Sequence, residues 1–351
     1  MAKVLVAMSG GVDSATTAKL LTEMGHTCGG VTLHLFDRAG VTCGTSRDLE
    51  DARLVATSLG IPFFVYDGRE IFKREVMGRF ISAYERGETP NPCVECNRYL
   101  KFDALHRFAK EAGYDYLATG HYARVVFQDG RYLLKRAKDD SKDQTYFLYS
   151  LTQEQLSRTL FPLGEMTKAE VRSLAEGAGL DNADKPDSQD ICFVSDGDYV
   201  AFLEKNAGRT YPEGDFVTKS GEVLGRHKGV VRYTVGQRRG LGIAAKEPLY
   251  VLSLDPLANT VTLGSNEDLF GTTLVAEDCN FISCDGIPEM RRLTAKIRYR
   301  HTAAPCTAWQ TGEGAIRVVF DTPQRAITKG QAVVLYDGDI VVGGGRITET
   351  I

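Results

Sequence analysis

The chain has 351 residues, of which 43% are hydrophobic and 25% are charged, and 42 Lys and Arg against 46 Asp and Glu give a net charge of -4. This length exceeds a single ordinary domain of roughly 100–200 residues, and the composition excludes a disordered or fibrous chain. The nearly balanced charge excludes a generalised polyanion binder, so any affinity for nucleic acid would depend on local clusters of Lys and Arg. We expect a cytosolic protein without a membrane span, because apolar runs are short and the N-terminal one is too short for a signal peptide.

The first two hundred residues alternate short apolar runs with segments of helical spacing, which is typical of βαβ units around a parallel sheet. We expect strands at 4–8, 31–35, 62–66 and 116–119 and helices over 13–24 and 49–59. Residues 87–97 contain two prolines and an Asn-Pro step, so they are expected to form a loop rather than a helix. Asp129-Gly130 predicts a hairpin, and Thr167 with Glu170 predicts a capping box at the start of a helix.

Beyond about residue 206 the helical spacing disappears, and short runs rich in Val, Thr, Tyr and Ile alternate with Gly, Asp and Asn. Asp337-Gly338 lies between two apolar runs and predicts a two-residue hairpin loop. The sequence therefore predicts an α/β protein of three domains: a parallel-sheet catalytic domain over 1–205, a small β-rich domain over 206–268 and a C-terminal β-barrel over 269–351.

A glycine-rich hexapeptide, Ser9–Ser14, follows the first expected strand and opens the first expected helix. Backbone N–H groups in such a loop bind phosphate oxygens, the two serines can donate hydrogen bonds, and Asp13 is a candidate ligand for Mg²⁺. The missing Walker lysine and the missing Gly-x-Gly-x-x-Gly exclude a P-loop kinase and a dinucleotide dehydrogenase. The hexapeptide resembles the pyrophosphate loop of the N-type ATP pyrophosphatases, which implies an enzyme that adenylates a substrate oxygen.

Three of the eight cysteines stand in a functional pattern. Cys93 and Cys96 form a Cys-x-x-Cys pair, and Cys192 follows a second irregular segment over 181–190. Structural zinc sites normally use four ligands, and no second pair is present. A thioredoxin-like pair would start a helix after a strand, which the expected loop does not provide. Inert thiols remain an alternative, and burial is the expectation for the remaining cysteines, Cys28, Cys43, Cys279, Cys284 and Cys306.

Motifs along the whole chain resemble, in combination, those of the bacterial tRNA-specific 2-thiouridylases. They lie at 89–97, 118–124, 142–148, 188–193, 234–242, 298–300 and 323–326. The resemblance implies that ATP adenylates the 2-oxygen of a wobble uridine in tRNA and that sulfur carried as a persulfide then displaces AMP. It also implies a persulfide donor, such as a cysteine desulfurase or a sulfur-relay protein, as a partner.

The resemblance carries specific roles onto this sequence. Cys192 would carry the persulfide, and Cys96 would release the sulfur by attacking it and leave a disulfide. The implied ATP contacts are Ala7, Met8, Ser9, Gly10, Gly11, Val12, Asp13, Ser14, Leu33 and Gly120. The implied tRNA contacts are Asn91, Pro92, Cys93, His121, Lys142, Asp143, Gln144, Arg298, Tyr299 and Gln331.

Cys93 departs from the family pattern, in which relatives carry an aspartate as the acid or base that helps the uridine to react. An alternative is that Cys93, Cys96 and Cys192 ligate a four-iron four-sulfur cluster whose free iron holds a sulfide for transfer. The persulfide route and the cluster route both stay open from the sequence, and so does the oligomeric state.

Two basic clusters are candidates for RNA binding, although solvated surface is the alternative interpretation. The first comprises Arg291, Arg292, Lys296, Arg298, Arg300 and His301, and the second comprises Arg226, His227, Lys228, Arg232, Arg238 and Arg239. A strand over 295–300 would place Lys296, Arg298 and Arg300 on one face, which suits a phosphate backbone. Two rival functions are a small-molecule adenylating ligase, which leaves the thiols unused, and a noncatalytic metal-containing RNA-binding module, which leaves the nucleotide loop unexplained.

Overall fold

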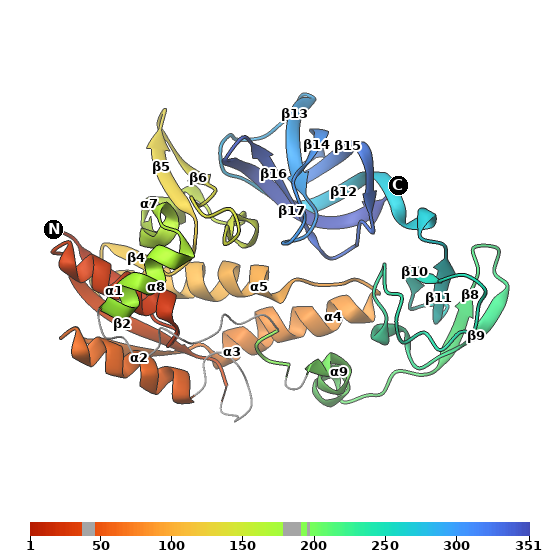
Figure 1. Ribbon diagram of the computed structural model, residues 1–351, viewed down its shortest axis with the longest axis horizontal. Coiled ribbons are helices and arrows are strands. Elements are labelled where there is room, and N and C mark those ends of the chain that lie inside the picture. Colours follow the sequence, from red (N-terminus) through yellow and green to blue (C-terminus); the bar gives the residue numbers. More distant parts are fainter. Residues whose placement is uncertain (37–45, 178–190, 195–196) are drawn as a thin grey trace.

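The computed structural model describes residues 1–36, 46–177, 191–194 and 197–351, and within these ranges the strands form three sheets (Figure 1). The first is a parallel sheet of order β3-β2-β1-β4-β7. Its strands are β1 (Lys3–Ala7), β2 (Thr27–His34), β3 (Phe63–Asp67), β4 (Tyr116–Thr119) and β7 (Thr159–Leu160). β1 lies at the point where the chain changes direction across the sheet, with β2 on one side and β4 on the other. Ligands of such sheets bind at the carboxyl ends of the strands at this point.

Helices pack on this sheet as the apolar spacing predicts. α1 (Val12–Glu23) turns Ala15, Ala18 and Leu21 toward the buried residues of β1. The other helices and helical turns of this region are α2 (Ser46–Ser58), α7 (Gln153–Ser157), α8 (Lys168–Gly177), η3 (Thr145–Phe147) and η4 (Pro162–Glu165). The predicted capping box is confirmed: Thr167 N–H donates to the Glu170 carboxylate at 2.6 Å, and Glu170 N–H donates to Thr167 Oγ1 at 3.3 Å.

Two long helices connect the parallel sheet with the rest of the molecule. The first runs through α3 (Arg69–Ile71), the π-helical η1 (Phe72–Gly78) and α4 (Arg79–Glu85), and the second runs through α5 (Pro92–Glu95), the π-helical η2 (Cys96–Ala104) and α6 (Leu105–Glu111). We call them the connecting helix (69–85) and the thiol helix (92–111). Figure 1 shows both beneath the C-terminal barrel, with the middle sheet (β8 to β11) at the opposite end of the molecule from β2 and β4.

The prediction of a loop over all of 87–97 is wrong in its second half. Pro92 is the first residue of α5, and the Asn91 side chain caps this helix by accepting the Cys93 N–H at 3.2 Å. Proline is compatible with the first turn of a helix, where its missing N–H would have no partner in any case. The Cys-x-x-Cys pair therefore begins a helix, which the expected loop had excluded.

The second sheet has the order β10-β11-β8-β9 and the third contains a closed barrel. The middle sheet comprises β8 (Gly214–Val217), β9 (Val223–His227), β10 (Tyr250–Asp255) and β11 (Thr260–Gly264), preceded by α9 (Tyr199–Ala207) and accompanied by the turns η6 (Val230–Arg232) and η7 (Glu267–Leu269). The barrel comprises β12 (Phe270–Phe281), β13 (Arg291–Lys296), β14 (Ala304–Gly312), β15 (Ala315–Arg325), β16 (Ala332–Asp337) and β17 (Ile340–Thr350), and β12 pairs with β17 to close it.

The predicted hairpin at Asp129-Gly130 is confirmed between β5 (Arg124–Gln128) and β6 (Arg131–Lys135). This hairpin belongs to the third sheet, because Lys135 pairs with Ile340 of β17. In the other predicted hairpin the loop is shifted by one residue, since Asp337 pairs with Ile340 and Gly338 takes the positive φ of +60°. The domain boundaries expected from the sequence stay a prediction. In the part of the chain that the structure describes, every helix is too short or too polar to cross a bilayer.

Candidate active site

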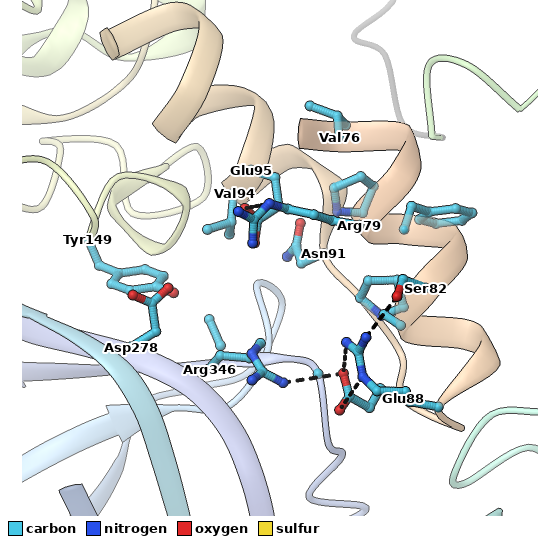
Figure 2. Close-up of a pocket in the computed structure, with 17 residues that line it drawn as sticks. Val76, Arg79, Ser82, Glu88, Asn91, Val94, Glu95, Tyr149, Asp278 and Arg346 are labelled. Atoms are coloured by element: carbon cyan, nitrogen blue, oxygen red, sulfur yellow. Dashed lines mark hydrogen bonds and ion pairs between the residues drawn. The ribbon is translucent and has the colours of Figure 1, made fainter. Parts of the chain in front are cut away.

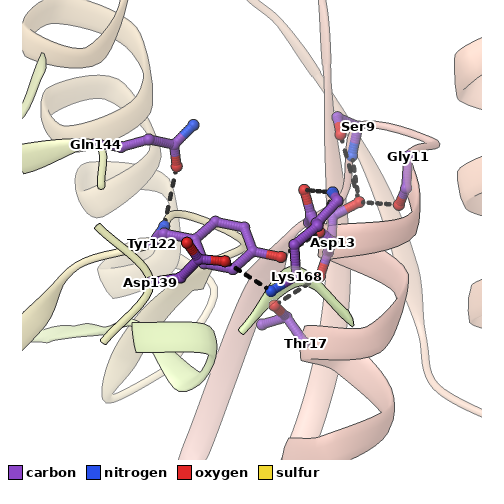
Figure 3. Close-up of polar contacts among 9 residues, drawn as sticks. Ser9, Gly11, Asp13, Thr17, Tyr122, Asp139, Gln144 and Lys168 are labelled. Atoms are coloured by element: carbon purple, nitrogen blue, oxygen red, sulfur yellow. Dashed lines mark hydrogen bonds and ion pairs between the residues drawn. The ribbon is translucent and has the colours of Figure 1, made fainter. Parts of the chain in front are cut away.

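The glycine-rich loop lies at the carboxyl end of β1, and Gly11 caps α1 in an extended conformation. Gly10 has a φ of +73°, which favours glycine. The Ser14 hydroxyl ties the loop together: it accepts the Ser9 N–H at 3.1 Å and donates to the Gly11 carbonyl at 3.0 Å (Figure 3). The loop therefore keeps a fixed shape around the N-terminus of α1, as a phosphate site requires.

Gly120 closes this loop from the neighbouring strand β4. A Cβ at Gly120 would lie 2.9 Å from the Asp13 carbonyl carbon and 2.9 Å from the Ser14 nitrogen, so only glycine fits without a shift of backbone. Leu33 lies one residue before the end of β2, on the other side of β1. The residues expected to contact ATP, namely Ala7 to Ser14, Leu33 and Gly120, thus lie at the carboxyl ends of three neighbouring strands.

Lys168 and Tyr122 complete the loop, and sequence reasoning missed both. Lys168 Nζ donates to both Asp13 carboxylate oxygens at 2.8 Å, and Tyr122 Oη donates to Asp13 Oδ1 at 2.9 Å (Figure 3). Only 9% of the Lys168 side chain is exposed. Lys168 is the first residue of α8, where the helix dipole disfavours a cation. A lysine at this unfavourable position is the one sequence signal that could have indicated a role for Lys168 in the site.

Two further residues attach the segment 139–144 to this site. Asp139 accepts the Lys168 N–H at 3.0 Å, and the Gln144 side chain accepts the Tyr122 N–H at 2.9 Å. The Ser141 hydroxyl, with the Lys168 N–H after it, lowers the pKa of Asp139. The segment expected to contact tRNA therefore lies beside the nucleotide loop.

His121 lies two residues after the end of β4 and is half-buried among aromatic rings. Its ring centroid lies 5.7 Å from that of Phe102 and 6.1 Å from that of Phe161, and its Nδ1 lies 2.7 Å from Thr119 Oγ1. Burial, with a smaller contribution from the Lys101 charge, lowers the pKa of His121 well below its usual value. The ring is therefore neutral at pH 7, which suits hydrogen bonding rather than donation of an imidazolium proton.

The three candidate thiols differ in exposure. Cys93 is exposed, whereas Cys96 and Cys192 are half-buried. Both half-buried thiols pack against one apolar cluster, which includes Leu35 after β2 and Phe193 beside Cys192. Within the described ranges, no group of three or more His, Cys, Asp or Glu side chains is arranged to hold a metal ion. The three thiols are therefore not gathered as the ligands that the cluster alternative requires.

The residues expected to contact tRNA fall into two sets. Asn91, Cys93, Lys142, Gln144 and Tyr299 are exposed or half-buried, and the Tyr299 ring lies 4.5 Å from that of Phe147. Asp143 is only 3% exposed, and its carboxylate accepts the Ala137 N–H at 3.2 Å and the Thr145 hydroxyl at 2.8 Å. Pro92 is buried, and Arg298 donates to the Arg325 carbonyl. For Asp143, Pro92 and Arg298 these positions favour an indirect role.

The basic clusters differ from their prediction. β13 ends at Lys296, so Arg298 and Arg300 do not follow Lys296 on one strand face. Several arginines of the two clusters are paired with carboxylates: Arg291 with Asp337, Arg292 with Asp321, Arg226 with Asp215 and Arg232 with Glu204. His227 is buried, which lowers its pKa, and the structure thereby removes much of the positive field that the sequence suggests.

The remaining cysteines follow the expectation of burial in part. Cys28 and Cys306 are buried, and Cys279 and Cys284 are half-buried. Burial raises the pKa of Cys279 and of Cys306 to about 12, so these thiols are protonated at neutral pH. Cys43 and residues 188–190 lie outside the described residues.

Known proteins match this chain over nearly its full length. Family models described as tRNA methyl transferase HUP domain, tRNA methyl transferase PRC-barrel domain and Aminomethyltransferase beta-barrel domain match residues 2–196, 200–265 and 271–347. A protein of Clostridioides difficile named tRNA-specific 2-thiouridylase MnmA is 49% identical over 99% of each chain. Its namesake from Carboxydothermus hydrogenoformans is 50% identical over 99% of this chain and 98% of its own.

Similarity to solved structures is weaker. The U34-tRNA thiolase NcsA from Methanococcus maripaludis, solved with its [4Fe-4S] cluster, is 24% identical over 58% of this chain and 67% of its own, with a TM-score of 0.36. This likeness is too low to carry an argument about the chemistry of the thiols.

Proposed function

Because this chain belongs to the family of tRNA-specific 2-thiouridylases, we propose that it uses ATP to replace the 2-oxygen of the wobble uridine in tRNA by sulfur. The observation that carries the proposal is a nucleotide loop closed by Gly120 and Lys168. The same N-terminal region of the chain also holds two half-buried thiols, Cys96 and Cys192, which pack on one apolar cluster. A small-molecule ligase would need only the loop, and an RNA-binding module would need neither the loop nor Lys168.

In the first step the uridine 2-oxygen attacks the α-phosphorus of ATP, and pyrophosphate leaves. The backbone N–H groups of Ser9–Ser14 and the N-terminus of α1 would bind the phosphates, and the Lys168 ammonium adds the cation that a Walker lysine supplies elsewhere. Asp13 holds Lys168 in place through both carboxylate oxygens.

The Asp13 carboxylate fits a role as Mg²⁺ ligand poorly, because Lys168 and Tyr122 already occupy its oxygens. Mg²⁺ would therefore arrive with the triphosphate and keep mostly water and phosphate ligands, as it prefers. No step of the proposed reaction is assigned to a metal held by the protein.

In the second step the Cys192 persulfide supplies the sulfur. The Cys96 thiolate attacks Cys192 Sγ, which forms a Cys96–Cys192 disulfide and releases hydrosulfide; hydrosulfide then attacks C2 of the uridine, and AMP leaves. A thiol reductant must reduce the disulfide before the next turnover, and a persulfide donor must reload Cys192. The shared packing of both thiols against one cluster supports this pairing.

The arrangement of the three thiols does not support the iron–sulfur route. Cys93 is exposed, the other two thiols are half-buried, and no three-ligand group is formed by the described residues. We assign Cys93 instead to the uridine side of the site, where it is exposed in the first turn of α5. The reaction places the enzyme where tRNA is, in the cytoplasm, with the persulfide donor as its protein partner.

The deciding experiment measures pyrophosphate release with ATP and unmodified tRNA, with and without a persulfide donor. Release that requires tRNA supports the thiouridylase, release that requires a small amine would support the ligase, and no release under any condition contradicts the proposal. Cys192→Ala should still release pyrophosphate but form no thiolated uridine, and full thiolation by this variant would remove Cys192 from its assigned role.

A further inference from the structure

The segment just before the thiol helix is bound to the C-terminal barrel. Thr89 N–H donates to the Lys329 carbonyl at 2.8 Å, and the Gln331 side-chain amide donates to the carbonyls of Thr89 at 2.8 Å and Pro90 at 3.4 Å. Lys329 and Gln331 lie between β15 and β16. Gln331 is expected to contact tRNA. Its side-chain amide instead bonds within the protein and holds Thr89 and Pro90, the two residues before the helix cap Asn91.

Gly330 brings the two backbones into close contact. It has a φ of +89°, and a Cβ there would lie 2.9 Å from Glu88 Cβ and 3.0 Å from the Thr89 nitrogen. Any larger residue at this position would push the segment away from the barrel. The segment and the barrel loop therefore fit each other over several residues and not through a single bond.

An ion pair strengthens this attachment. Arg346 of β17 lies 3.3 Å from the Glu88 carboxylate, and Arg86 contacts the same carboxylate at 2.9 Å. Only 16% of the Glu88 side chain is exposed. A carboxylate this protected depends on its two guanidinium partners, and one of them belongs to the barrel.

A second ion pair holds the other side of the Cys93–Cys96 turn. Arg98, two residues after Cys96, donates through both terminal nitrogens to the two carboxylate oxygens of Asp278 in β12. Such a forked arrangement fixes orientation as well as distance. The turn with the two thiols is thus held before and after by residues of the barrel.

A cavity separates these contacts. It has a volume of about 270 Å³ and lies between the connecting helix, the start of the thiol helix and the barrel (Figure 2). Arg79, Asn91, Glu95, Tyr149, Asp278 and Arg346 line it. Beside the cavity, Val94 of α5 and Ala332 of β16 belong to one buried apolar cluster, and across the cavity the polar contacts fix where the start of the thiol helix lies against the barrel.

We propose that the C-terminal barrel positions the Cys93–Cys96 turn for sulfur transfer through two ion pairs, Glu88 with Arg346 and Arg98 with Asp278. These four are positioning residues, which act through the thiol helix and do not touch the reacting atoms. A thiol displaced by even 1 Å from its line of attack loses roughly a hundredfold in rate, whereas the loop Ser9–Ser14 that would bind the phosphates lies outside this turn. The inference rests on the proposed function for its activity measurements.

The test uses Asp278→Asn and Arg346→Gln in the full chain, with Asp285→Asn as the matched control. Asparagine tolerates the φ of +52° at position 278. Asp285 also lies on the barrel side and pairs at 2.7 Å with an arginine of the N-terminal half, Arg131, which belongs to the β5–β6 hairpin. The control therefore removes an ion pair between the barrel side and the N-terminal half away from the thiol turn, at a carboxylate that is 94% exposed.

Three rates are measured for each variant: pyrophosphate release with tRNA, single-turnover thiolation from persulfide-loaded enzyme, and alkylation of Cys93 and Cys96 without substrates. Asp278→Asn and Arg346→Gln should keep pyrophosphate release within about twofold, slow thiolation about tenfold or more, and change alkylation at least about threefold. Asp285→Asn should match the wild type in all three. The double variant Arg98→Gln with Asp278→Asn should be no slower than either single variant, because one pair is lost in each case.

Wild-type thiolation rates in both variants would overturn the inference. Equal losses of adenylation and thiolation, or the same losses in Asp285→Asn, would also overturn it, because they indicate a general defect. If the wild type neither releases pyrophosphate nor thiolates tRNA, the proposed function fails, and alkylation alone then tests the positioning: unchanged alkylation rates in Asp278→Asn and Arg346→Gln would refute it.

Discussion

Replacing Lys168 by methionine tests the assignment of the nucleotide site. Methionine keeps much of the length and the apolar stem of lysine but removes the ammonium that donates to both Asp13 oxygens at 2.8 Å. Tyr122→Phe is the matched control, because it removes a different donor, at 2.9 Å, from the same carboxylate and leaves the cation in place.

The expected magnitudes follow from the burial of this pair. A hydrogen bond to a charged group contributes about 1.5–3 kcal/mol, but water can partly replace the lost donors because 28% of the Asp13 side chain is exposed. We therefore expect Lys168→Met to lower the free energy of unfolding by about 2 kcal/mol. Loss of a cation that stabilises charge in the transition state should lower the rate of pyrophosphate release by roughly a hundredfold to a thousandfold. Tyr122→Phe should lower it by no more than about tenfold.

The assay follows pyrophosphate release with tRNA at saturating ATP, together with chemical denaturation of each variant. Lys168→Arg, which keeps the charge, should recover part of the rate. If Lys168→Met releases pyrophosphate at nearly the wild-type rate, or if Tyr122→Phe and Lys168→Met lose equal activity, then Lys168 serves only to neutralise Asp13, and its assignment to the phosphates is wrong.

The remaining predictions concern three other positions. Gly120→Ala places a methyl group 2.9 Å from the backbone of Asp13 and Ser14, so ATP affinity, measured by calorimetry, should fall about tenfold or more while the fold persists, and unchanged affinity would contradict the close approach. Burial raises the pKa of Glu95, and the Arg79 charge opposes this with a smaller effect. The stability that the protonated Glu95 carboxyl contributes is therefore complete below the unfolded-state pKa of about 4.3 and is lost as pH rises through the folded-state pKa. Glu95→Gln should therefore gain stability relative to the wild type at pH 8 and not at pH 4 in denaturant titrations, and a constant difference between the two pH values would refute this. Because His121 is neutral at pH 7, the pH profile of adenylation should lack a step near 6.5, and such a step that disappears in His121→Asn would show that the ring titrates.

Sequence patterns succeeded where one residue type has one physical role. The alternation of apolar runs predicted β1 to β4, α1 and α2 to within about four residues, because burial on both faces requires continuous apolar strands, but it did not predict β7 or the connecting helix. Asp129-Gly130 predicted its hairpin because positive φ angles are needed there, and the structure has them at +52° and +79°. The loop expected over 87–97 failed in part because proline disfavours the interior of a helix but not its first residue.

Contacts between distant segments could not be predicted in this way. Lys168 lies 155 residues from Asp13, and its role depends on how α8 packs beside α1. The basic clusters looked accessible because the acidic partners of their arginines come from other strands, as with Arg292 and Asp321. Gln331 likewise meets Thr89 only because the barrel lies over the thiol helix.

The order of residues along the chain was sufficient to define the first strands and helices of the parallel sheet, the glycine-rich loop and the spacing of the thiol pair, since these depend on backbone conformation and on neighbours a few positions away. Tertiary structure alone decided which charges meet, which thiols are shielded from water and what holds the Cys93–Cys96 turn in place. Electrostatic and packing energies depend on distances in space, and chain folding brings together side chains whose separation in sequence carries no information about those distances.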